Sequence, residues 1–111
     1  MPVIDLEIRV PTGGDWAHAE RAVEAVCDAQ GLTVSLKATL VRYPGSIHWH
    51  VRHPDEPGTL EITLWESAHR IWFSARPGRA VPWTDTAAPR LQSALEAQLH
   101  GASVDQRAVS G

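Results

Sequence analysis

The fold is decided by residues 46–75, which read SIHWHVRHPDEPGTLEITLWESAHRIWFSA. Apolar and polar residues alternate in three runs, 46–53, 59–65 and 69–76. Alternation with a period of two is typical of strands that bury one face and leave the other to solvent. Because the connections are short, neighbouring strands are expected to pair antiparallel. The stretch therefore predicts three consecutive strands of one antiparallel sheet.

Two more strands are expected before this stretch. Residues 3–10 alternate in the same way and stop at a glycine-containing segment. Residues 33–42 also alternate, with Leu36 and Leu40 expected to face the core. This strand ends at the turn Tyr43-Pro44-Gly45, because Pro fixes φ and Gly tolerates a positive φ.

Two helices flank the four consecutive strands. The first follows Asp15, a good N-cap, and ends at Gly31, a residue suited to the position after a helix. The second is expected to begin within 84–86 and to end at His100. Pro89 is then placed in its first turn, where the missing amide hydrogen leaves no helical bond unmade.

The order β-α-β-β-β-β-α predicts an α+β fold, with a five-stranded, mainly antiparallel sheet and both helices packed on one face. This order resembles the topology of TATA-box-binding-protein-like domains, a topology that unrelated functions share. Residues 1–101 are expected to form one domain, and 102–111 a disordered C-terminal tail. The expected core residues under the helices are Ile4, Leu6, Ile8, Leu36, Leu40, Trp49, Ile62, Leu64, Ile71 and Phe73.

Composition narrows the class of protein. The net charge of −3 gives no general attraction to nucleic acid or anionic membranes. Cys27 is the only cysteine, so no internal disulfide forms, and its place on an apolar helix face indicates a buried, inert thiol. The start of the chain lacks the apolar run of a signal peptide, and no stretch reaches the ~20 apolar residues of a membrane span. We therefore expect a cytoplasmic protein that does not bind membranes.

The sheet face without helices is expected to be the binding face. Strand parity and a two-residue turn at Ser67-Ala68 pair Trp65 with Arg70, whereas a longer turn pairs Trp65 with Trp72. Parity also permits Arg52 opposite Glu61 and Lys37 near Arg52. The polar and aromatic side chains expected on this open face are Lys37, His48, His50, Arg52, Glu61, Trp65, Arg70, Trp72 and Arg76.

Three functions are open for this face. The first is a plain solvated surface, the second is an interface for a protein partner or a second copy of the chain, and the third is a site for an anionic small ligand or nucleic acid. Arg and Trp are enriched at interface hot spots, which favours a non-enzymatic binding or regulatory domain that forms a homodimer or binds another protein through this face. The alternative is a small enzyme or ligand sensor that binds an anionic substrate at His48, His50 and Arg52. A sizeable pocket beside the histidines would favour this alternative.

The run His48-Trp49-His50-Val51-Arg52-His53 is the one segment that looks like a metal motif. His48 and His50 point the same way from one strand. However, Arg52 stands where the HxHxDH motif of metallo-β-lactamase-like hydrolases needs a carboxylate. Lys37 and Arg52 are expected to add positive charge where a cation would sit. We therefore expect no metal, no other cofactor and no catalytic residues.

Overall fold

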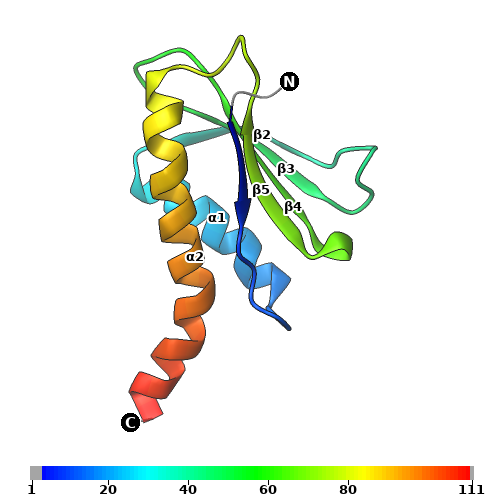
Figure 1. The fold of residues 1–111 in the computed structure, drawn as a ribbon, viewed down its shortest axis with the longest axis vertical. Coiled ribbons are helices and arrows are strands. Elements are labelled where there is room, and N and C mark those ends of the chain that lie inside the picture. Colours follow the sequence, from blue (N-terminus) through cyan, green and yellow to red (C-terminus); the bar gives the residue numbers. More distant parts are fainter. Residues whose placement is uncertain (1–3, 111) are drawn as a thin grey trace.

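The structure, a computed structural model, describes residues 4–110, and the side chains of residues 4–101. It has two layers, an antiparallel sheet and two helices that cover one of its faces (Figure 1). The elements are β1 (Ile4–Ile8), α1 (Trp16–Ala29), β2 (Thr33–Ala38), β3 (Ile47–Arg52), β4 (Leu60–Trp65), the 3-10 helix η1 (Glu66–Ala68), β5 (Arg70–Ala75) and α2 (Pro82–Ser110). The sheet order is β1-β5-β4-β3-β2, with every neighbouring pair antiparallel. The predicted fold class is confirmed.

The core lies between the sheet and the two helices. Trp49 and Phe73 are fully buried at its centre, and Val23 of α1 and Leu91 of α2 meet the sheet there. Asp15 caps α1 as predicted, since its carboxylate accepts the amide protons of two residues in the first turn. Of the expected core residues, those buried or packed against the core are Ile4, Leu6, Ile8, Trp49, Ile62, Leu64, Ile71 and Phe73.

Strand β2 departs from the prediction. Its pairing with β3 shifts between Val34 and Leu36, which is a β-bulge. One extra residue reverses the faces of all residues after it, so Leu36 lies opposite His50 and is 43% exposed instead of buried. Lys37 lies on the helix side instead, where its Nζ is 2.7 Å from a carboxylate oxygen of Glu20.

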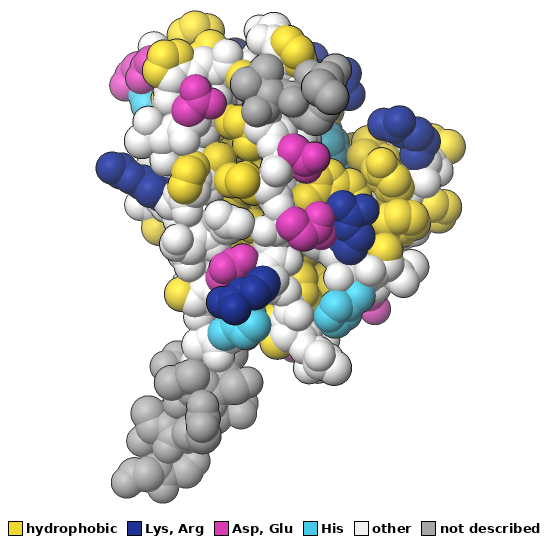
Figure 2. Space-filling view, viewed as in Figure 1, with side chains coloured by type: hydrophobic (Ala, Val, Ile, Leu, Met, Phe, Trp, Pro, Cys, Tyr) yellow, Lys and Arg dark blue, Asp and Glu magenta, His cyan; other side chains and the backbone are white. Residues whose placement is uncertain are grey.

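The strand also ends at Ala38 rather than at residue 42. Residues 39–46 form the β2–β3 loop, which turns back over the open face of the sheet, and Leu40 lines a pocket there instead of joining the core. Figure 2 shows hydrophobic side chains gathered on the side of the molecule that this loop forms. The loop is what converts a flat sheet face into a concave one.

Helix α2 begins at Pro82, earlier than predicted. The hydroxyl of Thr84 closes its first turn by bonding both the amide and the carbonyl of Val81. Pro89 consequently lies inside the helix, where its ring nitrogen cannot donate to the carbonyl of Asp85. The backbone of α2 is described to Ser110, but the side chains of 102–110 and all of Gly111 lie outside the described part. The expected tail at 102–111 therefore stays a prediction.

None of the helices within residues 4–110 is both long enough and apolar enough to cross a membrane.

Candidate functional site

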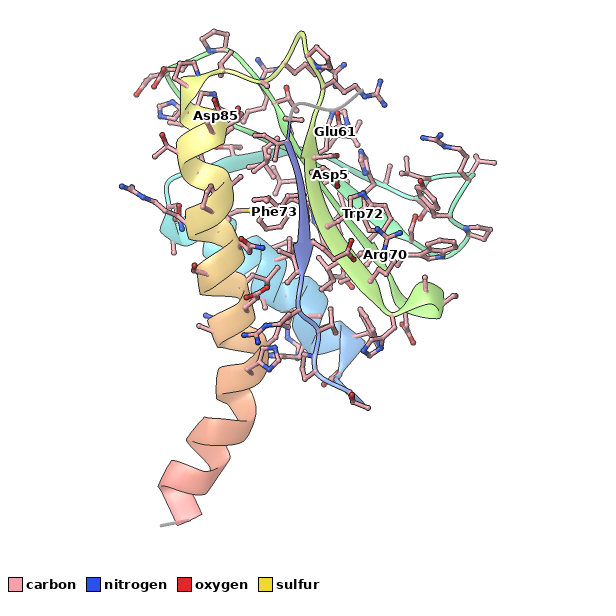
Figure 3. All side chains as sticks on the ribbon, in the orientation of Figure 1. Asp5, Glu61, Arg70, Trp72, Phe73 and Asp85 are labelled. Atoms are coloured by element: carbon pink, nitrogen blue, oxygen red, sulfur yellow. The ribbon has the colours of Figure 1, made fainter. Side chains whose placement is uncertain are left out.

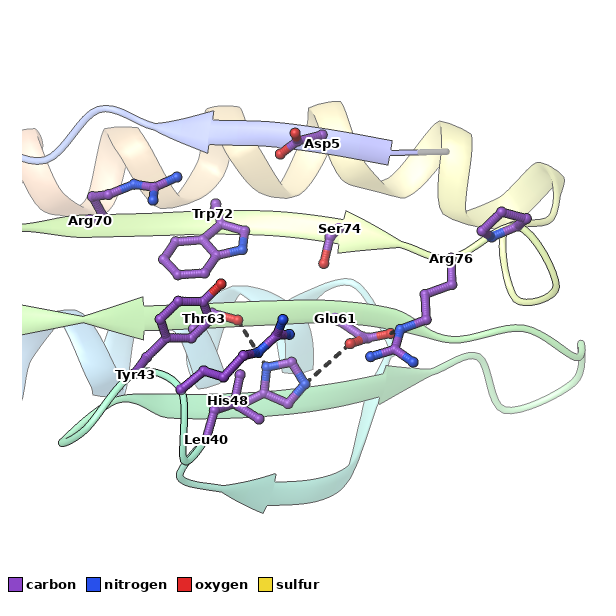
Figure 4. Close-up of a pocket in the computed structure, with 12 residues that line it drawn as sticks. Asp5, Leu40, Tyr43, His48, Glu61, Thr63, Arg70, Trp72, Ser74 and Arg76 are labelled. Atoms are coloured by element: carbon purple, nitrogen blue, oxygen red, sulfur yellow. Dashed lines mark hydrogen bonds and ion pairs between the residues drawn. The ribbon is translucent and has the colours of Figure 1, made fainter. Parts of the chain in front are cut away.

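A pocket of about 580 Å³ opens on the sheet face that the helices leave uncovered (Figure 4). Its floor comes from β3, β4 and β5, and the β2–β3 loop forms one wall. In Figure 3, Glu61 and Trp72 lie on this side of the sheet, whereas Phe73 points to the helices. The residues that line the pocket are Asp5, Leu40, Arg42, Tyr43, His48, Glu61, Thr63, Arg70, Trp72, Ser74, Arg76 and Pro77.

Aromatic contacts hold the loop over the sheet. The Tyr43 ring lies 4.8 Å from the Trp65 ring and meets the Trp72 ring edge-on at 5.3 Å. The indole nitrogen of Trp65 donates a hydrogen bond of 3.1 Å to the carbonyl of Pro44. Both tryptophans are half-buried as a result. The loop therefore has fixed contacts with the strands that it covers.

Three arginines surround the pocket. Arg70 makes two hydrogen bonds, of 2.8 and 3.0 Å, to the carboxylate of Glu7, and its guanidinium stacks 4.4 Å from the Trp72 ring. Arg42 lies 5.6 Å from the Tyr43 ring, and no carboxylate in residues 4–101 lies within 4.0 Å of it. Nε of Arg76 lies 3.4 Å from Oε2 of a buried carboxylate, Glu61. The pocket is thus rich in guanidinium groups.

A buried His–Glu pair forms part of the floor. Nε2 of His48 lies 3.2 Å from Oε1 of Glu61, and Nδ1 lies 2.9 Å from the hydroxyl of Thr63. Desolvation by burial lowers the pKa of His48, and the attraction of the Glu61 carboxylate opposes that shift. Nε2 of His50 is 3.9 Å from the same Glu61 oxygen. Two histidines and one carboxylate therefore converge at one end of the pocket.

The outer oxygen of Glu61 faces cations. Oε2 is buried and accepts no hydrogen bond within the described part of the chain. Nε of Arg76 lies 3.4 Å away from it and Nη1 of Arg79 3.8 Å. The two arginines compensate the buried negative charge without closing a hydrogen bond on it.

Seven of the nine predicted binding-face residues come together at this site. They are His48, His50, Glu61, Trp65, Arg70, Trp72 and Arg76. Lys37 lies on the opposite face because of the bulge, and Arg52 lies at the end of β3 opposite Thr33, outside the pocket lining. The β4–β5 register is confirmed, with Trp65 opposite Arg70.

The β3–β4 register differs by two residues from the one, permitted by strand parity, that places Arg52 opposite Glu61. Glu61 lies opposite His50, and Thr63 opposite His48, so Arg52 does not pair with Glu61. A shift by two keeps every side chain on its face, so parity alone could not distinguish the two registers. The shift brings the Glu61 carboxylate to the histidines instead of to Arg52.

Sequence reasoning missed the contribution of Arg42, Tyr43 and Arg79. The first two belong to a segment interpreted as a strand end and a turn, and Arg79 to a loop after β5. A Pro-Gly pair beside Tyr43 was the available signal for a loop that carries an aromatic ring.

Comparison with protein families, with curated proteins and with solved structures gives no match to this chain. What the protein does must therefore be inferred from the residues of the pocket.

Proposed function

We propose that the protein is a ligand-binding domain whose pocket takes a small molecule with a flat apolar part and an anionic group. The pocket volume of about 580 Å³ carries this proposal. Sites for small molecules are concave, mostly preformed and typically roughly 300–1,000 Å³ in volume. They combine apolar walls with a few polar groups that fix orientation. The pocket beside the histidines has this volume, and its lining is more polar than usual, with eight polar residues beside Leu40, Tyr43, Trp72 and Pro77.

The apolar part of the ligand is matched by the loop wall and the sheet. Tyr43 and Trp72 meet edge-on, and Leu40 adds aliphatic surface from the same loop. Aromatic rings offer large, stiff contact surfaces that stack on planar groups. A flat ring system is therefore the partner that these side chains suit.

The anionic group is matched by the arginines. Arg42 has no carboxylate partner among residues 4–101. The side chain of Arg76 is 66% exposed, although its Nε lies 3.4 Å from Oε2 of Glu61. Guanidinium groups recognise carboxylates and phosphates through paired hydrogen bonds. Arg70, in contrast, is already held by Glu7 and orients Trp72. We assign the anion-binding role to Arg42 and Arg76.

Isothermal titration calorimetry with a set of aromatic carboxylates and aryl phosphates tests this assignment. 2-Naphthoate serves as one probe, and the neutral 2-naphthylmethanol as its control. Hydrogen bonds to charged groups contribute roughly 1.5–3 kcal/mol, so the acid should bind about tenfold or more tightly than the alcohol. The variants Arg42→Gln and Arg76→Gln should lose this preference.

Arg21→Gln is the matched control, because Arg21 is an exposed arginine on α1. It should bind like the wild type. Absence of binding by every aromatic acid in the set, or equal binding by the acid and the alcohol, would contradict the proposal.

The protein-binding or homodimer hypothesis stays a prediction. Trp65 and Trp72 are half-buried against Tyr43, so they offer a partner less apolar surface than the sequence indicates. Among the side chains of residues 4–101, the large apolar ones that remain exposed are Leu36, at 43%, and Val41, at 95%. Sedimentation equilibrium of the wild type and of Trp72→Ser measures self-association, and a wild type that stays monomeric at high concentration removes the homodimer.

A further inference from the structure

We propose that His48, His50 and Glu61 form a binding site for a divalent first-row transition ion, with zinc as the best fit. Each residue offers one donor atom, and the three atoms lie within 4.8 Å of one another. Two imidazole nitrogens and one carboxylate oxygen are ligands that zinc takes in proteins. This proposal rests on the distances between these protein atoms and does not depend on the ligand proposed for the pocket.

The distances suit a tetrahedral ion. Bonds of 2.0–2.1 Å at tetrahedral angles place two donor atoms about 3.3 Å apart. Nε2 of His48 is 3.2 Å from Oε1 of Glu61, and Nε2 of His50 is 3.9 Å from the same oxygen. The two imidazole donor atoms lie within 4.8 Å of each other, so the side chains would have to rotate to bring all three donors to this spacing.

The sheet fixes this arrangement. His48 and His50 alternate on one side of β3, and Glu61 lies directly opposite His50 on β4. The imidazole rings lie 5.1 Å apart and almost perpendicular, at 74°. Ligands on two paired strands are held more rigidly than ligands on loops, which lowers the entropy lost on binding.

Contacts behind the ligands resemble those of a metal centre. When Nδ1 of His48 donates its proton to the Thr63 hydroxyl, 2.9 Å away, the lone pair of Nε2 faces Oε1 of Glu61. In the other tautomer Nε2 donates its proton to Oε1 and Nδ1 accepts from the Thr63 hydroxyl, so both contacts are satisfied without an ion, and zinc would select the tautomer with the proton on Nδ1. Metal-bound histidines commonly use the second ring nitrogen for such a bond, which fixes the tautomer and the ring orientation.

The arginines beside Glu61 are compatible with a carboxylate that coordinates the metal through one of its two oxygens. Arg76 and Arg79 approach Oε2, while Oε1 faces both histidines. A ligating carboxylate is usually held by further polar groups on its other oxygen. The positive charge lowers metal affinity, and an anion in the pocket offsets that effect.

Lys37 and Arg52, the two cations expected to disfavour a metal, do not lie at the three ligands. The bulge takes Lys37 to the helix side of the sheet, and the register takes Arg52 away from Glu61. Three protein ligands leave a fourth tetrahedral position open, and His48 and Glu61 line the pocket. An ion here would present an open coordination position to the pocket, as zinc sites that act on substrates do.

The test uses the full chain without an affinity tag, treated with a chelator and then titrated with ZnCl₂ in the absence of any organic ligand. One zinc per chain is expected, and Co²⁺ should give the intense visible absorption of a tetrahedral site. The variants His48→Ala, His50→Ala and Glu61→Gln should each weaken binding by roughly tenfold or more, because even changes to outer-sphere partners cost about that much.

His53→Ala is the matched control, since Nε2 of His53 lies 3.6 Å from a carboxylate oxygen of Glu56 on the loop after β3. It should bind zinc like the wild type. Circular dichroism reports folding. The His50 side chain is 24% exposed and less buried than those of His48 and Glu61, so His50→Ala still tests the proposal if the other two variants unfold. No zinc uptake by the wild type, or uptake that His50→Ala leaves unchanged, would overturn the proposal while leaving the aromatic-acid titration unaffected.

Discussion

Oε1 of Glu61 on β4 lies 3.2 Å from Nε2 of His48 on β3, on the sheet face that no helix covers. The two residues are not direct cross-strand partners, because His48 pairs with Thr63 and Glu61 with His50. Their side chains meet diagonally and are almost completely buried. Ionisable side chains are rarely buried unless they are paired, and buried ionisable pairs are frequent at functional sites. The His48–Glu61 pair therefore indicates a functional site on this face of the sheet.

Leu64→Ala should lower the free energy of unfolding by about 2–5 kcal/mol, because Leu64 is 2% exposed and its truncation leaves a cavity. Leu36→Ala, at the exposed position on β2, should change it by no more than about 0.5 kcal/mol. Urea denaturation of both variants measures the difference. Equal losses would contradict the bulge and the assignment of the two sheet faces.

Tyr43→Ala should release the β2–β3 loop from the sheet. The ring makes two aromatic contacts, with Trp65 and Trp72, and such pairs contribute about 0.5–1.5 kcal/mol each beyond burial. Stability should fall modestly, and binding of 2-naphthoate should fall by a larger factor because one wall of the pocket is lost. A variant that binds the acid as tightly as the wild type would show that the loop does not form that wall.

Glu24→Gln tests an interaction on the helix side. Hydrogen bonds from Lys37 and from the Trp49 indole lower the pKa of Glu24. A carboxylate with a depressed folded-state pKa adds stability above its unfolded-state value, and that contribution disappears as pH falls through the folded-state pKa. The variant should therefore be less stable than the wild type at pH 7, and the difference should shrink towards acid pH. Thermal denaturation between pH 7 and pH 3 measures it, and a difference that grows on acidification would contradict this explanation.

Cys27 should react slowly with thiol reagents. Desolvation raises the pKa of Cys27 to about 12, and its side chain is buried on the core-facing side of α1. At pH 8 the reaction with a disulfide reagent should be limited by opening of the protein and should accelerate in urea. Immediate stoichiometric labelling of the native protein would show that the thiol is accessible.

Strand periodicity was sufficient to predict most of the fold. Alternating residues on β1, β3, β4 and β5 assign the correct faces, because each strand presents one apolar side to α1 and α2. The short connection after Trp65 limited the β4–β5 register to two alternatives, of which the structure has the one with Trp65 opposite Arg70. Residue pairs joined by a short turn have few alternatives, which explains why this part of the prediction succeeded.

The pocket could not be predicted in the same way. A bulge at Ser35 leaves no signature in the alternation, so Leu36 and Lys37 were assigned to the wrong faces. The β3–β4 connection is long enough to allow registers that differ by two residues, and only the three-dimensional structure brings Glu61 to His50. The aromatic contact of Tyr43 with Trp72 joins residues 29 positions apart, beyond the range of local patterns.

The indole N–H signals of the five tryptophans give the most direct test of the pocket, in ¹H–¹⁵N spectra recorded during a titration with 2-naphthoate. Trp72 lines the pocket and Trp65 bonds the loop, whereas the indoles of Trp49 and Trp83 donate to Glu24 and to the Pro57 carbonyl, away from it. We expect saturable shifts at Trp72 and Trp65, with little change at the other three signals. Shifts confined to Trp83 or Trp16, or no saturable shift at Trp72, would contradict a ligand site between the β2–β3 loop and the sheet.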